Sequence, residues 1–301
     1  MAHGTKLTEG QQELLELESL VAQRAKPRPV ALGVLEYPSN LVSSIEGAAG
    51  RLVAIRPPTI VAVPVLLLRA GHGKIDMPAQ VAHLRAHYPH ISWRLAPPLL
   101  PHPSLLQVAQ ERLAAVCLGR PQSNAIDAVL FVGRGSHDPT ANADLFKIAR
   151  LFAERYRYPL VEACFISQAN PGVPEGIRRC VALGARSIAV LPYFLHDGIL
   201  PRRVLEQTAA THRTLEDVDC FVTQRLGNHP LLVDLLLLRA REAFYRTPTF
   251  PCLADHESQG SLGHVWNTVP TVSNHHDHVH IALAQEPGSD TFATPVPRGD
   301  H

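Results

Sequence analysis

Three side chains suited to metal and proton chemistry follow segments that are typical of buried β-strands. His3 lies in His-Gly-Thr at the start of the chain, Glu36 ends the segment VALGVLE, and His72 follows TIVAVPVLLL. Neutral imidazole binds borderline divalent ions such as Co²⁺, Fe²⁺ and Ni²⁺, and a carboxylate can bind a metal or relay protons. The alternative interpretations are a frayed terminal His3, a solvated loop residue His72, and a helix-capping or surface Glu36.

An internal repeat indicates which elements position these residues. Three pairs of segments match in the same order, 131, 128 and 127 residues apart: His3-Gly4-Thr5 with Arg134-Gly135-Ser136, Pro64 with Pro192, and His102 with His229. Such ordered matches with slowly changing spacing indicate a duplicated unit.

The second copy begins with a strand that the first copy lacks. Before Arg134 lies AIDAVLFVG, an apolar and β-branched run that ends at a glycine turn and leads into a helix. Before His3 there are only Met1 and Ala2. We therefore interpret the opening residues as a strand-to-helix loop without its strand. A start codon assigned too far downstream and a natural truncation both explain this.

Each copy alternates strands with helices, which predicts an α/β fold with parallel sheets covered on both faces. We expect two tandem three-layer αβα domains, the first without its N-terminal strand: a catalytic domain at 1–120, a degenerate second domain at 121–247, and a disordered His-rich tail at 248–301. The expected strands are 30–36, 59–68, 91–99, 128–133, 160–167, 187–195 and 219–226, and the expected helices are 9–25, 39–49, 77–88, 103–117, 140–156, 172–183, 200–211 and 229–245.

Composition argues against several classes of function. The net charge of +1 gives no global field that would attract nucleic acid or an anionic membrane. Five scattered cysteines without a CxxC pair suggest neither a disulfide framework nor a thiolate zinc site. The longest apolar run, which starts at Leu231, is too short to cross a bilayer. We expect a cytoplasmic protein that binds neither nucleic acid nor membrane.

The ordered motifs resemble the sirohydrochlorin chelatases of the CbiX/SirB type, in their long, two-domain form. Five motifs within residues 1–245 carry the resemblance: His3-Gly4-Thr5, LGVLE ending at Glu36, PVLLLRAGHGKIDMP around His72, PHPSLL at 101–106, and VGRGSHDPTANAD in the second copy. The resemblance implies a class II chelatase fold. It also implies insertion of a divalent metal into sirohydrochlorin without ATP or another nucleotide.

In that family, histidines that match His3 and His72 bind the metal and act in catalysis. Metal insertion needs a site that holds the ion without trapping it, and bases that accept two pyrrole protons; Glu36 would support either task. Cobalt, for cobalamin synthesis, is favoured because the two-domain form and the His-rich tail resemble the cobaltochelatases. Iron, for sirohaem, and nickel remain alternatives.

The second copy lacks all three candidate residues, although it keeps the glycines, the proline and the His-Pro turn. The replacements are Arg134 for His3, Ser167 for Glu36, and Ile199 or Leu200 for His72. The first domain is therefore predicted to be catalytic, and the second to close the cleft.

Basic side chains are expected to bind the carboxylates of sirohydrochlorin, because guanidinium forks match carboxylates. The predicted set is Lys6, Arg69 and Lys74 beside the two histidines, with Arg134, Arg202 and Arg203 in the second domain. Each of these residues alone is more simply a solvated charge, so the prediction concerns the group.

Other histidines have simpler explanations. His83 and His87 are spaced i,i+4 without the acid of a zinc motif, which favours a solvated helix face. The HHDHVH segment at 275–280 is either a metal buffer for Co²⁺ or Ni²⁺ or a polar tail. His102 and His229, each directly before a proline, are predicted to be structural residues at helix starts.

Two classes of function remain open at this point. The first is a monomeric chelatase whose two domains form the cleft for sirohydrochlorin. The second is a non-catalytic metal- or tetrapyrrole-binding protein, which would follow if the missing strand left His3 unanchored.

Overall fold

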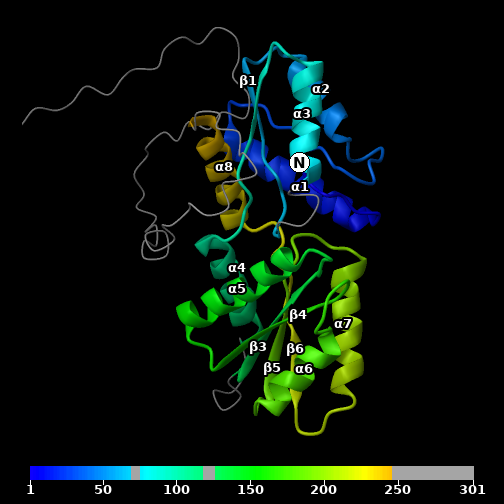
Figure 1. Ribbon diagram of the computed structural model, residues 1–301, viewed down its shortest axis with the longest axis vertical. Helices are drawn as coiled ribbons and strands as arrows, with labels where there is room; N and C mark the ends of the chain where they lie inside the picture. The colour runs from blue at the N-terminus through cyan, green and yellow to red at the C-terminus, as the bar shows by residue number, and fades with distance from the viewer. Residues whose placement is uncertain (69–74, 118–125, 246–301) are drawn as a thin grey trace, which may run out of the picture.

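The computed structural model describes residues 1–68, 75–117 and 126–245, which form two lobes joined at a waist (Figure 1). The first lobe contains β1 (Thr59–Ala62), β2 (Ser92–Leu95), α1 (Thr8–Ala25), α2 (Ile45–Val53), α3 (Met77–His87) and α8 (Pro230–Tyr245). The second lobe contains β3 (Ala128–Gly133), β4 (Leu160–Phe165), β5 (Ser187–Pro192), β6 (Asp219–Val222), α4 (Pro103–Cys117), α5 (Pro139–Tyr156), α6 (Val173–Ala182) and α7 (Ile199–His212).

The sheet of the second lobe is complete and parallel, in the order β4-β3-β5-β6. Its central strand β3 is apolar throughout, and Ala128 to Val132 are fully buried. Helices cover both faces of the sheet, which explains why the strand shows no polar alternation. Phe131 of β3 packs edge-on against Phe152 of α5 and also contacts Tyr193.

The sheet of the first lobe is reduced to β1 and β2 within the described residues. Ala2 makes isolated parallel bridges to Val34 and to Val65. It therefore lies between the segment 30–36 and the residues that follow β1. The expected strand 30–36 is therefore wrong as a continuous element: only Val34 bridges, to Ala2 and Ser44. Met1 and Ala2 reach only one end of the segment 30–36, so the rest of it has no central strand to pair with.

Most expected helices agree with the structure to within one or two residues. The expected helix 39–49 is displaced and appears as α2, because Ser44 takes the N-cap position and accepts a hydrogen bond from the Gly47 N–H at 3.1 Å. The expected strand 59–68 ends at Ala62, two residues before Pro64, which has no N–H for the ladder.

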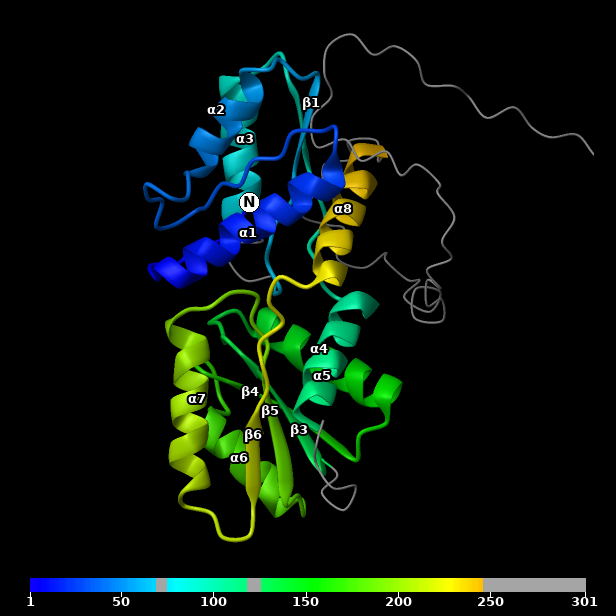
Figure 2. The same ribbon diagram turned by 180° about the vertical axis from the view of Figure 1, so that it is seen from behind.

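The last helix of each half of the chain packs on the other lobe. Helix α4 ends the first half but packs against β5 and α5, and α8 ends the second half but packs against α1, β1 and β2. Figures 1 and 2 show α8 beside β1 in one lobe and α4 beside α5 in the other. One apolar cluster runs through both lobes and includes Leu14, Leu105, Phe131 and Leu236, and a further smaller cluster lies in each lobe. The predicted boundary at 120/121 divides the chain into its two sequence repeats. The lobes divide differently, because α4 lies in the second lobe and α8 lies in the first (Figure 1).

No helix in the described residues is long and apolar enough to span a membrane. The predicted tail at 248–301, including the HHDHVH segment, lies outside the described residues.

Candidate active site

Two loops with the same backbone meet the waist from the two lobes. Gly4 and Gly135 have φ values of 101° and 83°, in the left-handed region that favours glycine. A Cβ on Gly4 would lie 1.9 Å from the carbonyl oxygen of Glu36, and a Cβ on Gly135 would lie 1.8 Å from that of Ser167. Each glycine therefore lets its loop pass directly over the end of the neighbouring segment.

His3 lies at this crossing in the first lobe, and its carbonyl accepts the Glu36 N–H at 2.8 Å. Its ring donates through Nδ1 to the Gly4 carbonyl oxygen at 3.3 Å. The Nε2 atom accepts a hydrogen bond from Arg134 Nη1, also at 3.3 Å. An imidazole that donates through Nδ1 is in the tautomer whose Nε2 can serve as a metal ligand in place of this hydrogen bond.

Arg134 belongs to the second lobe and occupies the position that His3 occupies in the first. The two side chains meet across the waist, so equivalent positions of the two halves face each other. Arg134 is exposed, and its guanidinium carries donors in a planar fork. The structure thus brings together a predicted metal ligand and a predicted carboxylate ligand.

Glu36 and Lys6 are also close to His3. The backbone hydrogen bond from Glu36 to His3 places the two residues side by side. Lys6 is exposed, and its Nζ lies 4.9 Å from the ring centre of Tyr37, the residue after Glu36. His3, Glu36, Lys6 and Arg134 therefore form one cluster, which we call the waist cluster.

The other predicted residues of the first half, Arg69, His72 and Lys74, lie outside the described residues. Their positions relative to His3 remain predictions. No group of three or more His, Cys, Asp or Glu side chains that could hold a metal occurs within residues 1–68, 75–117 and 126–245.

Arg202 and Arg203 lie in the first turns of α7, and both are exposed. Arg202 forms ion pairs with Asp197 at 2.8 Å and with Glu9 of α1 at 3.5 Å. Hydrogen bonds from Arg202 and from the Gly198 N–H, together with the charge of Arg225, hold the pKa of Asp197 below its usual value despite partial burial. Arg202 therefore links α7 of the second lobe to α1 of the first lobe, and it also adds positive charge at the waist.

Sequence analysis missed the residue that ties α1 to the second lobe. Glu13 accepts the Asp197 N–H at 2.7 Å and pairs with Arg225. Its carbonyl oxygen accepts a hydrogen bond from Asn228 at 2.7 Å. A single glutamate in a helix of mixed polarity gives no signal of this kind in the sequence, because its partners lie about two hundred residues away.

A second missed residue, His196, follows β5 near the same contacts. Both of its ring nitrogens are buried, and neither has a hydrogen-bond partner within the described residues. Burial, with the nearby Arg225 charge, lowers the pKa of His196 from 6.5 to about 4. The ring is therefore neutral at pH 7.

The structural interpretation of His102 and His229 is confirmed. Nδ1 of His102 accepts the Ser104 N–H and Nδ1 of His229 accepts the Leu231 N–H, both at 3.2 Å, in the first turns of α4 and α8. His229 also contacts Glu111 of α4 through Nε2 at 2.9 Å.

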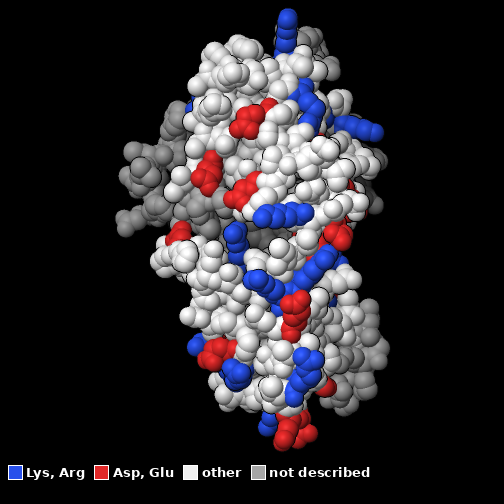
Figure 3. Space-filling model, turned by 90° about the vertical axis from the view of Figure 1, so that its right-hand side faces the viewer, with Lys and Arg blue, Asp and Glu red and all other residues white. Residues whose placement is uncertain are grey.

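Positive charge gathers where the lobes meet. Figure 3 views the side of the molecule that carries α7, and it shows several Lys and Arg side chains around the waist, with a few acidic groups between them. A local concentration of this kind can hold an anionic ligand even though the net charge of the chain is only +1.

Comparison with known proteins identifies the family of the chain. The CbiX family model matches residues 1–116 and again residues 128–243. The chain belongs to the CbiX family. Both matches include the loop that leads to the waist, with His3 in the first and Arg134 in the second.

Curated relatives of this CbiX chain carry two activities in their names. A sirohydrochlorin cobaltochelatase of Priestia megaterium is 34% identical over 208 residues, which cover 68% of this chain and 67% of the relative. A sirohydrochlorin ferrochelatase of Bacillus subtilis is 26% identical over 244 residues, which cover 80% of this chain and 89% of the relative.

Solved structures show the same fold. The sirohydrochlorin chelatase SirB from Bacillus subtilis subspecies spizizenii, in complex with cobalt, superimposes with a TM-score of 0.66 at 22% identity. That match covers 80% of this chain and 92% of the SirB chain. The predicted class II chelatase fold is therefore confirmed.

Proposed function

We propose that this CbiX protein is a sirohydrochlorin chelatase, which inserts a divalent metal, most favourably cobalt, into the macrocycle. The observation that carries the proposal is the contact between His3 and Arg134 at the waist. It places an imidazole, which binds borderline divalent metal ions, beside a guanidinium that can bind a substrate carboxylate.

His3 is assigned as the ligand of the incoming metal through Nε2. Because Arg134 donates to that atom, the metal must displace this hydrogen bond, and the released guanidinium can then turn to a carboxylate of sirohydrochlorin. His72 is proposed as the second ligand. Glu36 supports the site by accepting a pyrrole proton or by binding the metal.

The positive side chains around the waist are proposed to orient the macrocycle. Lys6 and Arg134 lie in the waist cluster, and Arg202 and Arg203 lie at the start of α7. Arg69 and Lys74 complete the proposed set. No nucleotide is needed, because the reaction exchanges two pyrrole protons for a metal ion already in solution.

Cobalt is proposed over iron because the cobaltochelatase of Priestia megaterium is more similar in sequence than the ferrochelatases of the same organism and of Bacillus subtilis, at 34% identity against 29% and 26%. We propose cobalamin synthesis as the pathway that uses the cobalt product. The same ligands also accept iron or nickel, so metal supply contributes to the choice.

We further propose a tandem organisation, with a catalytic domain at 1–120 and a degenerate domain at 121–247, acting as a cytoplasmic monomer. The matching bounds of α1 and α5, each 131 residues apart, support the repeat. Buried thiols at Cys164 and Cys180 support a reducing location.

The test uses metal-free sirohydrochlorin, whose absorption spectrum changes when a metal enters. Co²⁺ and the protein together should convert it faster than Co²⁺ alone, and His3→Ala should reduce the rate about 100-fold. The matched control is His137→Ala, because His137 is an exposed histidine in the corresponding loop of the second half. A spectral shift proportional to protein, without turnover, would instead identify a non-catalytic binding protein.

A further inference from the structure

Gln11 lies near the start of α1, just after the loop that carries His3, and it is buried. Its Nε2 donates to the Thr5 carbonyl oxygen at 2.9 Å, and its Oε1 accepts the Ser39 hydroxyl at 2.9 Å. Thr5 is two residues after His3, and Ser39 is three residues after Glu36. One side-chain amide therefore joins the two segments that bring His3 and Glu36 to the waist. We call this arrangement the Gln11 bridge.

The segment that contains Ser39 is a tight turn. Tyr37 has a φ of 56°, in the left-handed region that residues other than glycine rarely adopt. The Ser39 hydroxyl oxygen accepts the Leu41 N–H at 3.1 Å and the Val42 N–H at 3.2 Å. A hydroxyl has one proton and two lone pairs, so these two bonds and the bond to the amide use its full capacity. The turn and the bridge thus depend on the same oxygen.

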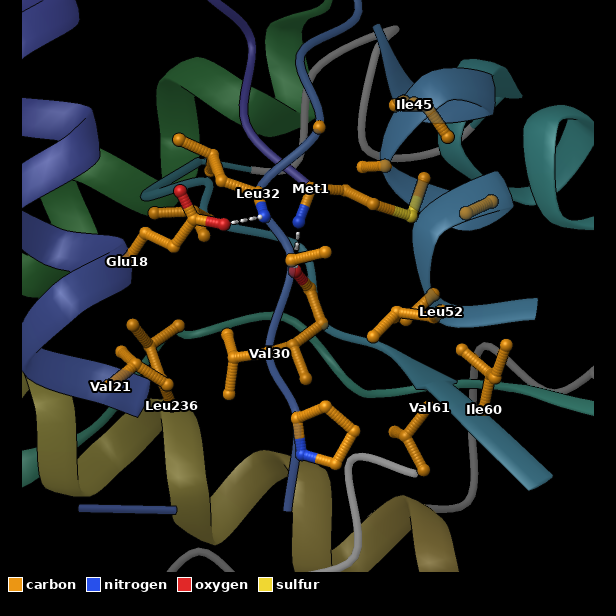
Figure 4. A pocket seen from close by; sticks show the side chains of 18 of the residues that line it. Met1, Glu18, Val21, Val30, Leu32, Ile45, Leu52, Ile60, Val61 and Leu236 are labelled. Carbon is orange, nitrogen blue, oxygen red and sulfur yellow. Dashed lines mark hydrogen bonds between the residues drawn. The ribbon is translucent and has the colours of Figure 1, made fainter. Parts of the chain in front are cut away.

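The backbone before His3 is held by other groups. Met1 lines an apolar cavity of about 110 Å³ (Figure 4), and its buried amino group donates to the Val63 carbonyl at 2.9 Å. The Ala2 N–H donates to the Gly33 carbonyl, also at 2.9 Å. The Gln11 bridge therefore acts on the part of the loop that follows His3.

In the second lobe, the matching amide turns back to its own loop. Asn142 occupies the position of Gln11, 131 residues later. Its Nδ2 donates to the Ser136 carbonyl at 2.8 Å, as Gln11 donates to Thr5. Its Oδ1, however, accepts the Ser136 N–H at 2.9 Å. A side chain that is one methylene shorter holds the loop in the same way, but it uses its acceptor within that loop instead of on the neighbouring segment.

The proposed chemistry of the two lobes explains this difference. Arg134 is proposed to bind a carboxylate by itself, whereas His3 and Glu36 must reach the same ion. Ligand distances to a metal vary by only about 0.2 Å, so two ligands from different segments need a fixed spacing. The hydrogen bond from the Glu36 N–H to the His3 carbonyl joins the segments at one point, about which they can rotate. The Gln11 bridge adds a second point and restricts that rotation.

We propose that Gln11 is a positioning residue, which holds the Glu36 carboxylate at the distance from His3 at which both side chains can bind one Co²⁺ ion. This inference rests on the proposed function, because it takes His3 and Glu36 as the groups that receive the metal. Gln11 acts through these two residues and contacts neither the ion nor the macrocycle, since its amide donates and accepts within the bridge.

The test uses Gln11→Asn, which gives the first lobe the amide of the second. The shorter side chain can still bond to the Thr5 loop, as Asn142 bonds to its own loop, but it cannot also reach Ser39. The Kd for Co²⁺, measured by calorimetric titration of the protein alone, should rise about tenfold. The KM for Co²⁺ should rise with it, and the KM for sirohydrochlorin should stay the same. Gln23→Asn makes the same change at an exposed position of α1 and should alter none of these constants.

Hydrogen exchange measures the bridge without any activity. The Glu36 amide should exchange about tenfold faster in Gln11→Asn. The Ser167 amide, which makes the matching bond in the second lobe at 3.0 Å, should exchange at an unchanged rate. Ser39→Ala removes the bridge from its other end and should give the same exchange rate and the same Kd for Co²⁺. The double variant should show no further change, because both substitutions remove one interaction.

An unchanged Kd for Co²⁺ in Gln11→Asn would overturn the proposal, even with faster exchange at Glu36, because the bridge would then support only the fold. Additive effects of Gln11→Asn and Ser39→Ala would also overturn it. Failure of the proposed function has a different signature: the unaltered chain would bind Co²⁺ without speeding its insertion, and the titration and exchange data would still report the effect of Gln11. If the unaltered chain binds no Co²⁺, both proposals are wrong.

Discussion

The loops that carry His3 and Arg134 have the same backbone but opposite chemistry. Both pass over a neighbouring carbonyl at a left-handed glycine, and both are followed by helices of 18 residues. One presents an imidazole to the waist and the other a guanidinium. The comparison shows that one loop backbone can present different side chains at the waist; in the proposed function the imidazole binds the metal and the guanidinium binds a carboxylate.

The two sheets differ more than the loops do. Within the described residues, the second lobe has a four-stranded sheet around a fully buried β3, and the first has two strands and an apolar cavity. Loop geometry is nevertheless the same in both lobes, because Met1 and Ala2 accept the same ladder bonds as Val132 and Gly133. The register of two residues is enough to place His3.

The largest effect should come from adding a Cβ at the shared glycines. Gly135→Ala should cost about 4 kcal/mol of unfolding free energy, because the Cβ would overlap the Ser167 carbonyl at a positive φ. Gly4→Ala should cost less, since the first sheet is already incomplete and can shift. Chemical denaturation measures both, with Gly50→Ala as a control, because nothing lies within 4 Å of a Cβ there. Equal costs would contradict a looser first lobe.

The buried amino group should make the stability of the present chain depend on pH between 5 and 8. The unfolded chain binds this proton below pH 8 and the folded chain only below about 5, so unfolding free energy should fall by on the order of 3 kcal/mol as pH decreases through this range. Glu18 faces the amino group and opposes part of the effect. Acetylation of the amine should remove this slope, because it converts the amine into an amide N–H that does not titrate. A slope that persists would contradict the assignment.

His196 should add a second acid sensitivity at lower pH. Its folded-state pKa of about 4 lies below the ordinary 6.5, so the stabilisation is complete above pH 6.5 and is lost as pH falls towards 4. The corresponding residue of the first half is Leu68. His196→Leu should therefore flatten the stability curve between pH 6.5 and 4 by on the order of 2 kcal/mol. His212→Leu, at the end of α7, is the control and should leave the curve unchanged.

Arg134→Ser should separate substrate binding from chemistry. Loss of a guanidinium that binds a carboxylate should raise KM for sirohydrochlorin about tenfold, with kcat nearly unchanged. Arg150→Ser removes an exposed i,i+4 pair on α5 and should change neither constant. A fall in kcat at constant KM would indicate that Arg134 acts on the metal ligand instead.

Glu13→Gln should have the smallest effect. The amide can still accept the Asp197 N–H but loses the charge that pairs with Arg225, so unfolding free energy should decrease by about 1 kcal/mol. Glu154→Gln removes the partner of Arg150 on an exposed surface and should cause no measurable change. If both variants have the same unfolding free energy, the contacts of Glu13 between the lobes do not stabilise the protein.

The sequence predicted those features that depend on local pattern or on the repeat. The bounds of α4, β3 and α8 followed from apolar periodicity and from the His-Pro pairs, and the smaller sheet of the first lobe followed from comparing the two copies. The sequence predicted that Arg134 borders the substrate pocket, but it did not predict the contact between Arg134 and His3. The distance between these two side chains depends on how the lobes meet.

The wrong strand prediction and the features that the sequence did not reveal have a common cause, because local sequence does not specify their partners. Segment 30–36 has the composition of a strand but lacks the neighbour that would pair with it. His196 and Glu13 acquire their environments from residues distant in the chain. The exchange of α4 and α8 is invisible to periodicity, because an amphipathic helix fits either lobe equally well.

That exchange makes the two halves mutually dependent. A chain cut between α4 and β3 would separate α4 from the sheet of the second lobe and α8 from the sheet of the first lobe. Each sheet would then expose the apolar surface that its helix covers. Such fragments should associate when mixed and regain the paired arrangement. Each half must therefore keep the packing surface that the helix from the other half covers.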